Sequence, residues 1–338
     1  MEAGDTRYGQ QAGTAEQIHA GDPRRHVAAT PPRAIISRRD GSRQTTVDLM
    51  QLVREIDVGM DVHGDGIADL DPAHIYFFSH SFGGSFGAPF LAVEPSVGVG
   101  VFNAIGGGWV DKAGRLSAGS QRPGIGSSLA ARVPPLLNSP GIAELDGVPI
   151  AGPRFNENMP LRDRLPLPVR LEDGTSYDIQ SPVINTVPGA MAIQEELENQ
   201  QWVTQAGNPL AYAPHLRKQP LAGVPAKSVI IQFNKGDMTA NNPMTTAIVR
   251  AGDLADRITF YRNDLAFADD PNVPKNPHTI LNSIGSADPL VAAIARGYQE
   301  QIATFFETDG QEVIHPEPSQ YFEVPIQSPL PEDLNYLP

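Results

Sequence analysis

The chain has 338 residues and a formal net charge of −14, from 25 basic and 39 acidic side chains. Hydrophobic residues make up 40% of it, which suffices for the core of one large α/β domain or two smaller ones. The acidic balance argues against nucleic-acid binding, because phosphates need a clustered basic surface. The absence of cysteine excludes disulfides and thiolate-bound zinc or iron–sulfur sites.

Targeting signals are not evident in the chain. No run of apolar residues approaches the ~18 residues of a transmembrane helix, so we expect no integral membrane segment. The first residues, MEAGDTRYGQQAGTAEQ, lack the basic and then apolar layout of a signal peptide. The sequence therefore predicts no export signal in this chain and leaves its localisation open.

The N-terminal part is the least regular. Residues 1–40 are polar, and we expect a loose leader with at most one short strand at Ala34-Ile35-Ile36. A helix follows over about 44–57, where apolar residues recur at helical spacing. A turn-rich loop, 61–69, then leads into the apolar run 74–78, which predicts a strand.

A parallel sheet is expected from the next elements. The strand at 74–78 is followed by a small-residue turn, a predicted helix over about 86–93 and a predicted strand over 97–102. A strand, a helix and a strand at this short spacing indicate a parallel crossover. The fold class that follows is α/β, with a mostly parallel sheet flanked by helices.

This rhythm breaks between about 106 and 225, where Gly and Pro punctuate short segments around one helix at about 191–202. An insertion of this size between core strands is typical of a cap or lid. The α/β rhythm then resumes with a strand at 229–233, a helix at 243–251 and a strand at 258–261.

The last helix is the clearest in the sequence. Asp288 is a good N-cap, Pro289 suits the first turn, and Gly310 ends the pattern. Residues 311–338 form a Pro-rich, acidic tail. The expected organisation is therefore a leader (1–40), an α/β domain (41–310) that contains the cap insertion, and this tail.

The turn Ser79-His80-Ser81-Phe82-Gly83-Gly84 has the outline of a nucleophile elbow. In such an elbow a serine occupies a sharp, strained turn between a strand and a helix. The residues two before and two after the serine must be small, because strand and helix press together there. Gly83 meets this demand fully, and Ser79 meets it approximately. A nucleophile at Ser81 requires an acid and then a histidine later in the chain.

One histidine lies where such a partner is expected. His278 is in a loop after the last predicted strand and before the last helix. His74 and His80 flank the elbow strand too closely to reach back to Ser81. His278 is therefore the predicted general base.

Two aspartates compete for the role of the acid. Asp237 follows the strand 229–233 directly, and Asp264 follows the strand 258–261. Strand order favours Asp237, whereas Asp264 is well placed for a structural contact with Arg262.

Each feature also has an ordinary interpretation. A small-residue turn around a serine is common, Asp237 is able to cap the next helix, and His278 is compatible with an unpartnered loop residue. Their order along the chain, each after a predicted strand, favours a catalytic group of Ser81, Asp237 and His278.

The stretches RQTTVDLMQLVREIDVGMDV, GDGIADLDPAHIYFFSHSFGGSFG, FNKGDMTANNP and KNPH together resemble the bacterial extracellular lipase and esterase branch of the α/β-hydrolases. The resemblance covers about Ser42 to Thr308 and is loosest in the inserted region. It implies ester hydrolysis through an acyl-enzyme. Ser81 would be the nucleophile, Asp237 the orienting acid, His278 the general base and the backbone N–H of Phe82 one oxyanion donor.

The chain departs from the family pattern in two places. Ser79 replaces the customary glycine of the elbow. A full hydrolase sheet also has several strands before the elbow helix, and a loop among them supplies the second oxyanion donor. We therefore expect these N-terminal strands to be missing from this chain, through truncation or a late start codon. The family is normally exported.

Two functions from different classes follow. The first is a serine carboxylic-ester hydrolase, acting on a small-molecule or lipid ester, with the cap shaping an apolar acyl pocket. The alternative is a truncated, catalytically silent hydrolase-like fragment or binding module. A peptidase of the same superfamily is a weaker third option. No cofactor is implied by any of them.

The loop 61–69 suggests a separate metal hypothesis. Asp61, Asp65 and Asp69, with glycine at the sixth position, fit a calcium loop. His63 occupies the place of an oxygen donor, however, and Pro72 replaces the closing glutamate. A solvated turn is the default interpretation of this loop.

Overall fold

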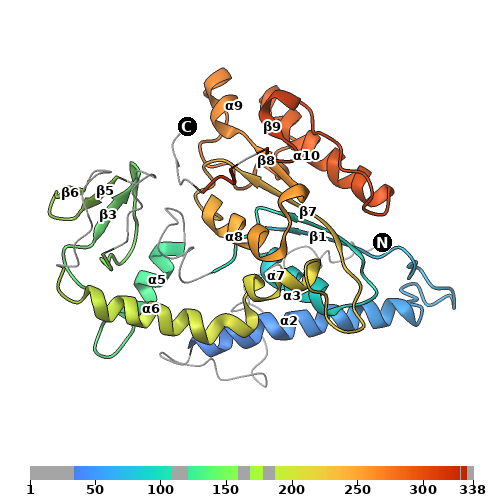
Figure 1. The fold of residues 1–338 in the computed structure, drawn as a ribbon, viewed down its shortest axis with the longest axis horizontal. Helices are drawn as coiled ribbons and strands as arrows, with labels where there is room; N and C mark the ends of the chain where they lie inside the picture. Colours follow the sequence, from blue (N-terminus) through green and yellow to red (C-terminus); the bar gives the residue numbers. More distant parts are fainter. Residues whose placement is uncertain (1–33, 109–120, 159–167, 178–186, 328, 333–338) are drawn as a thin grey trace, which may run out of the picture.

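The computed structural model describes residues 34–108, 121–158, 168–177, 187–327 and 329–332 (Figure 1). The described part has an α/β fold with two sheets. Its helices are α2 (Ala34–Asp57), α3 (Gly83–Val93), α5 (Gln121–Ala130), α6 (Ala190–Thr204), α7 (Pro209–Leu216), α8 (Asn242–Gly252), α9 (Asn263–Asp269) and α10 (Pro289–Glu307). Its strands are β1 (Tyr76–His80), β2 (Val99–Asn103), β3 (Ile142–Leu145), β4 (Val148–Pro149), β5 (Val169–Leu171), β6 (Ser176–Tyr177), β7 (Ser228–Asn234), β8 (Ile258–Tyr261) and β9 (Phe322–Glu323).

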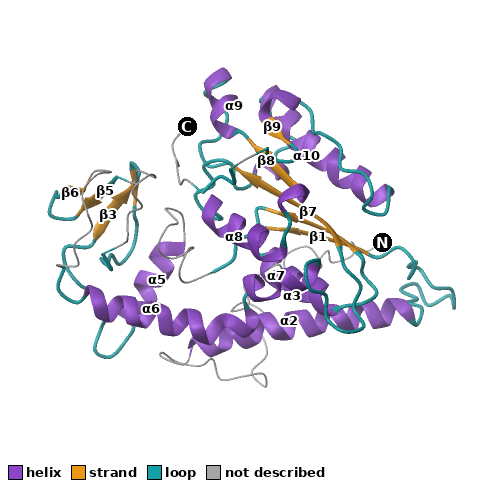
Figure 2. Cartoon of the chain, in the orientation of Figure 1, coloured by secondary structure: helices purple, strands orange, loops and turns teal. Residues whose placement is uncertain are grey.

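The main sheet has five strands in the order β1-β2-β7-β8-β9 (Figure 2). The first four strands are parallel, and β9 is antiparallel to β8. Parallel strands end at the same edge of a sheet, so the loops after β1, β2 and β7 meet there. Within the described residues, β1 lies at one edge of this sheet.

Helices cover both faces of the main sheet, as the alternation of side chains along buried strands requires. On β2, Phe102 packs into the core formed with α3, α7 and α8, and Val101 packs on the other side against Phe305 of α10. The long helix α2 adds Val53 to the first core. The sheet is thereby a middle layer between helices.

The N-terminal prediction is wrong in one respect. Ala34–Ile36, expected as a short strand, is the first turn of helix α2. Further along, α2 packs closely on a turn from elsewhere in the chain: a Cβ on Gly207 would come within 2.8 Å of the Arg39 carbonyl oxygen. Neither isoleucine of the first turn pairs with a strand in the described residues, and β-propensity without such a partner does not decide the local structure. Residues 37–40 of the predicted leader also belong to α2, which begins ten residues earlier than expected, and residues 1–33 lie outside the described residues.

The inserted region contains the second sheet, with the antiparallel order β4-β3-β5-β6. Beside it, a buried bidentate ion pair joins Arg122 and Glu157, with Nη2 to Oε2 at 2.7 Å and the guanidinium 4.2 Å from the Phe155 ring centroid. Part of the insertion belongs to the main domain, because Ala213 and Leu216 of α7 pack into the core of the main sheet.

The predicted tail, 311–338, contributes to the main sheet. Its residues Phe322 and Glu323 form β9, and Phe322 pairs with Tyr261 of β8. The aromatic rings of Tyr261, Tyr298 and Phe322 pack together there. This pairing buries Phe322 in the cluster that holds α10 against the sheet.

Candidate active site

Ser81 occupies a strained turn at the carboxyl end of β1. Its φ angle is +53°, in the left-handed region that residues with a side chain rarely adopt. The turn is held by hydrogen bonds at both ends: the Ser81 N–H donates to the Asn103 carbonyl (2.8 Å), and its own carbonyl accepts from the Gly84 N–H (3.0 Å). Helix α3 begins at Gly83, so the serine stands between strand and helix, as the sequence predicts for an elbow.

The small residues around Ser81 are required by close contacts. A Cβ on Gly83 would lie 3.2 Å from the Ser79 Cβ, and one on Gly84 would lie 2.5 Å from Ile105 Cγ1. Serine at position 79 fits because Gly83 leaves room for it. The Ser79 hydroxyl is buried without a hydrogen-bond partner, which is an energetic cost that glycine would avoid.

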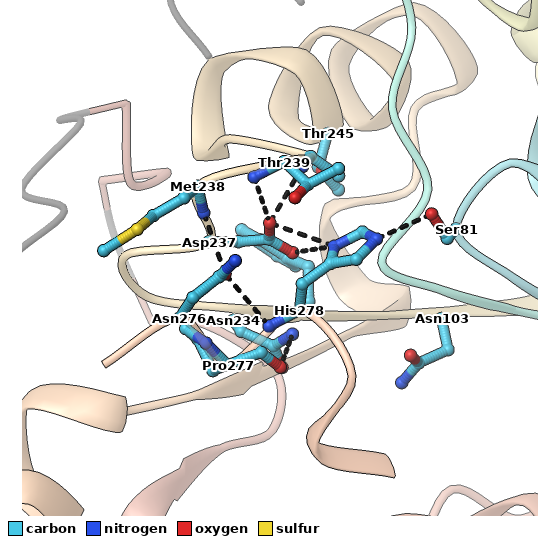
Figure 3. Close-up of polar contacts among 12 residues, drawn as sticks. Ser81, Asn103, Asn234, Asp237, Met238, Thr239, Thr245, Asn276, Pro277 and His278 are labelled. Carbon is cyan, nitrogen blue, oxygen red and sulfur yellow. Dashed lines mark hydrogen bonds and ion pairs between the residues drawn. The ribbon is translucent and has the colours of Figure 1, made fainter. Parts of the chain in front are cut away.

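The structure brings Ser81, His278 and Asp237 together in one hydrogen-bonded chain (Figure 3). Ser81 Oγ lies 2.6 Å from His278 Nε2, and His278 Nδ1 lies 2.8 Å from Asp237 Oδ2. An ionised carboxylate only accepts, so Nδ1–H donates to Asp237 and Nε2 is left to accept the serine proton. This is the tautomer that a general base needs.

Asp237 is oriented by the backbone that follows β7. Its Oδ1 accepts hydrogen bonds from the N–H groups of Thr239 and Ala240, both at 2.8 Å. The side chain is 1% exposed, so water does not compete with these donors. The carboxylate is thereby aimed at His278, with an extra contact from Oδ1 to Nδ1 at 3.0 Å.

Two asparagines hold the histidine loop against the aspartate loop (Figure 3). Asn276 Oδ1 accepts from the N–H groups of Met238 (3.1 Å) and His278 (3.3 Å). Asn234, the last residue of β7, donates from Nδ2 to the Pro277 carbonyl (3.2 Å). These bonds fix the separation of the two loops. The sequence offers a signal for them, because both asparagines lie within three residues of a predicted site residue.

The rival aspartate has a different partner. Asp264 accepts two hydrogen bonds from the Arg262 guanidinium, at 2.9 and 2.8 Å. Arg262 also donates to Glu323 of β9. The structural contact that the sequence left open for Asp264 is therefore what the structure contains.

His80 is closer to the site than the sequence indicates. Its ring centroid lies 5.3 Å from that of His278, and its Nδ1 donates to Asn103 Oδ1 at 2.8 Å. Asn103 in turn donates to Gln232 Oε1, and Gln232 donates to Gln301 Oε1. This row of buried amides keeps the His80 proton on Nδ1. Burial lowers the pKa of His80 below its usual value, and the nearby His278 acts in the same direction.

Phe82, the predicted oxyanion donor, lies at the N-terminus of α3. Its backbone N–H follows the nucleophile directly, and the positive end of the helix dipole favours negative charge at this point. The phenyl ring packs edge-on against Phe86, with 5.0 Å between centroids.

The loop considered for calcium has other partners for its carboxylates. Asp61 accepts backbone N–H groups from Gly64 (2.6 Å) and Gly66 (2.6 Å), and the Gly66 bond chiefly holds the pKa of Asp61 below its usual range. Asp69 accepts from Val62 and from the His63 ring. Within the described residues, no group of three or more His, Asp or Glu side chains is arranged to hold a metal ion.

Comparisons with protein-family models, with curated proteins and with solved structures give no match to this chain. None of the helices in the described ranges is both long and apolar enough to cross a membrane.

Proposed function

We propose that the protein is a serine carboxylic-ester hydrolase that works through an acyl-enzyme on Ser81. The observation that carries the proposal is the unbroken hydrogen-bonded chain from Ser81 Oγ through His278 to the buried carboxylate of Asp237. A serine hydroxyl becomes a competent nucleophile when a base accepts its proton and a third group orients that base. The strained conformation of Ser81 supports the same assignment, because such strain concentrates at functional sites.

In the proposed reaction, Ser81 Oγ attacks the ester carbonyl carbon while its proton passes to His278 Nε2. Asp237 stabilises the imidazolium that forms. The backbone N–H of Phe82 donates to the carbonyl oxygen as that oxygen becomes negative. The alcohol then leaves with the proton from His278, and a water molecule, deprotonated by the same histidine, releases the acid and restores Ser81.

The lipase and esterase branch of the α/β-hydrolases is the family that we propose for the chain. The motifs around Ser81, Asp237 and His278 support this kinship, as does the order of the three residues along the chain. The alternating strands and helices of the main sheet agree with it.

A second candidate is a binding module without catalysis. It is favoured by the position of β1, which carries Ser81 and yet lies at an edge of the described sheet, with Phe78 44% exposed. An exposed strand edge is a template for pairing with another chain. This candidate predicts a folded protein whose Ser81 does not react.

A fluorophosphonate probe separates the two candidates, because it reacts with activated serines. The wild type and Ser81→Ala would be incubated with the probe, and the labelled peptide identified by mass spectrometry. The hydrolase predicts a single adduct on Ser81 and none in the variant. Circular dichroism and thermal unfolding of both proteins verify that they are folded. A folded wild type without an adduct on Ser81 contradicts the hydrolase.

A further inference from the structure

We propose that a pocket beside Ser81 binds the acyl part of the ester and admits only short, uncharged acyl groups, with Met244 setting its size. The inference rests on the proposed hydrolase function and goes further by naming the substrate class. The pocket lies between the start of α3, the loop after β2 and the start of α8. Its lining consists of Ser81, Phe82, Ser85, Ala104, Gly106, Thr239, Ala240 and Met244.

The position of the pocket indicates which part of the ester it holds. The leaving alcohol must lie next to His278, because His278 Nε2 returns the proton to it. Ser81 lines the pocket and His278 does not. The part of the ester that stays bonded to Ser81 is the acyl group. The pocket is therefore on the acyl side of the serine.

The pocket is small. Its cavity volume, counted as the space that the centre of a water molecule can occupy, is about 20 Å³. By this measure roughly 10–15 Å³ is needed for one water molecule. A methyl or ethyl group is of this size, and an octyl chain is not. Among the described residues that line it there is no charged side chain, so a charged acyl group would be desolvated there without a partner from them.

Met244 occupies the space that would otherwise enlarge the pocket. The residue is 3% exposed, and its methyl carbon lies so near Gly106 that a Cβ on that glycine would come within 2.4 Å of it. The three heavy atoms nearest to such a Cβ all belong to Met244. The two positions therefore share one volume, which either side chain is able to fill.

The wall that carries this pair is held in place by hydrogen bonds. Thr245 Oγ1 donates to the Ile105 carbonyl at 2.6 Å, and the Gly107 N–H donates to the Met244 carbonyl at 3.4 Å. The Gly108 N–H donates to Asn208 Oδ1, which also caps α7. The loop after β2 cannot move away from α8 without breaking these bonds. Acyl size is consequently limited by side chains rather than by a loop that yields.

The test compares p-nitrophenyl acetate, butyrate and octanoate, which share one leaving group. For the wild type we expect kcat/KM to fall by at least about tenfold from acetate to octanoate, since a pocket discriminates by about tenfold or more per methylene that does not fit. Met244→Ala should raise the butyrate-to-acetate ratio by about tenfold. Met191→Ala, which truncates an exposed methionine of α6, is the matched control and should leave the ratio unchanged.

A double variant makes the test independent of the stability of Met244→Ala. Adding Gly106→Ala to Met244→Ala refills the shared volume, so the ratio should return toward that of the wild type. A pair of acetates with different alcohols, p-nitrophenol and 1-naphthol, reports on the other side of the serine. Their ratio should be the same in the wild type and in Met244→Ala.

The outcomes separate the two claims. Equal rates on acetate and octanoate in the wild type, or a butyrate-to-acetate ratio that Met244→Ala does not change, overturn the assignment of the pocket and leave the hydrolase standing. A changed ratio between the two alcohols would move the pocket to the leaving-group side and overturn the assignment as well. A folded wild type that hydrolyses none of these esters overturns the hydrolase itself.

Discussion

Among the histidine–aspartate pairs of the described residues, His63–Asp69 and His278–Asp237 have nearly the same geometry and very different surroundings. His63 Nδ1 lies 2.7 Å from Asp69 Oδ1, and His278 Nδ1 lies 2.8 Å from Asp237 Oδ2. The His63 side chain is 75% exposed, whereas that of His278 is 11% exposed. In water such a pair gains little, because solvent screens its charges and competes for its hydrogen bonds. Distance alone therefore does not distinguish a turn from a site.

The surroundings give the second pair its chemical capacity. Asp237 is oriented by two backbone N–H donors, and the second ring nitrogen of His278, Nε2, lies 2.6 Å from Ser81 Oγ. Asp69 also accepts two backbone N–H groups, from Val62 (2.6 Å) and His63 (3.3 Å), but it closes an exposed turn. A candidate base is recognised by its third partner and by its burial, more than by its carboxylate.

Removing the third partner should have the largest effect. Ser81→Ala should lower kcat on p-nitrophenyl acetate by on the order of 10⁴–10⁶-fold, which is the usual loss when a catalytic serine is deleted. The midpoint of thermal unfolding should change little, because Ser81 is only partly buried and alanine at this position makes no new contact. Activity retained within tenfold of the wild type would contradict the role of Ser81.

The two carboxylates offer a matched comparison. Asp237→Asn should lower kcat by about 10⁴-fold, since an amide no longer fixes the His278 tautomer. Asp69→Asn makes the same chemical change in the exposed pair and should leave kcat within about twofold, because surface pairs contribute little. Steady-state kinetics of both variants on one ester measures this. Equal losses in the two variants would show that burial is not what separates the pairs.

A smaller effect is expected from His80, the buried histidine beside His278. Its lowered pKa means that below pH 6.5 the unfolded chain binds a proton that the folded protein excludes, so this residue subtracts stability as pH falls. The groups that face it are Asn103, His278 and Asp237. His80→Gln keeps a donor for Asn103 without a titrating ring. Urea unfolding from pH 7 to pH 5 should show the wild type losing stability relative to this variant.

The opposite result would be a difference in the free energy of unfolding between the two proteins that stays constant over this pH range. It would show that His80 does not contribute to the pH dependence of stability. It would also show that the amide row, rather than the charge of His80, is what matters at this position.

The smallest effect concerns the exposed turn. A calcium loop occupied at 100 times its dissociation constant would stabilise the protein by about 2.7 kcal/mol. The carboxylates of Asp61 and Asp69 already accept backbone donors, so we expect millimolar calcium to leave the thermal unfolding midpoint unchanged. An upward shift that Asp61→Asn abolishes would contradict this interpretation.

The parts of the fold that the sequence predicts well are those governed by local rules. The strand Ile258–Tyr261 and the helix from Pro289, with its Asp288 cap, follow from alternation, periodicity and capping. The strands of the second sheet are two to four residues long. Such segments are too short to show either the two-residue alternation of a strand or the 3.6-residue repeat of a helix. Strand β9 depends on a partner about sixty residues away in the chain, which no local pattern specifies.

The site shows the same division. Ser81, Asp237 and His278 were predictable because each follows a predicted element, and parallel strands deliver such residues to one edge. The sequence predicts only that His80 lies too close to Ser81 along the chain to reach back to it. In the structure the His80 ring lies beside that of His278, a residue far away in the sequence. The pocket and Met244 depend on side-chain packing between α8 and the loop after β2, which periodicity does not describe.

In the proposed mechanism, Asp237 and His278 activate Ser81 as a nucleophile because the pair is buried and His278 contacts the serine hydroxyl. The most direct measurement is the rate at which a fluorophosphonate modifies Ser81 in the wild type, in Asp237→Asn and in Asp69→Asn. We expect equal rates in the wild type and Asp69→Asn, and a rate slower by orders of magnitude in Asp237→Asn. A folded wild type whose Ser81 is not modified, or a rate that Asp237→Asn leaves unchanged, would contradict the claim.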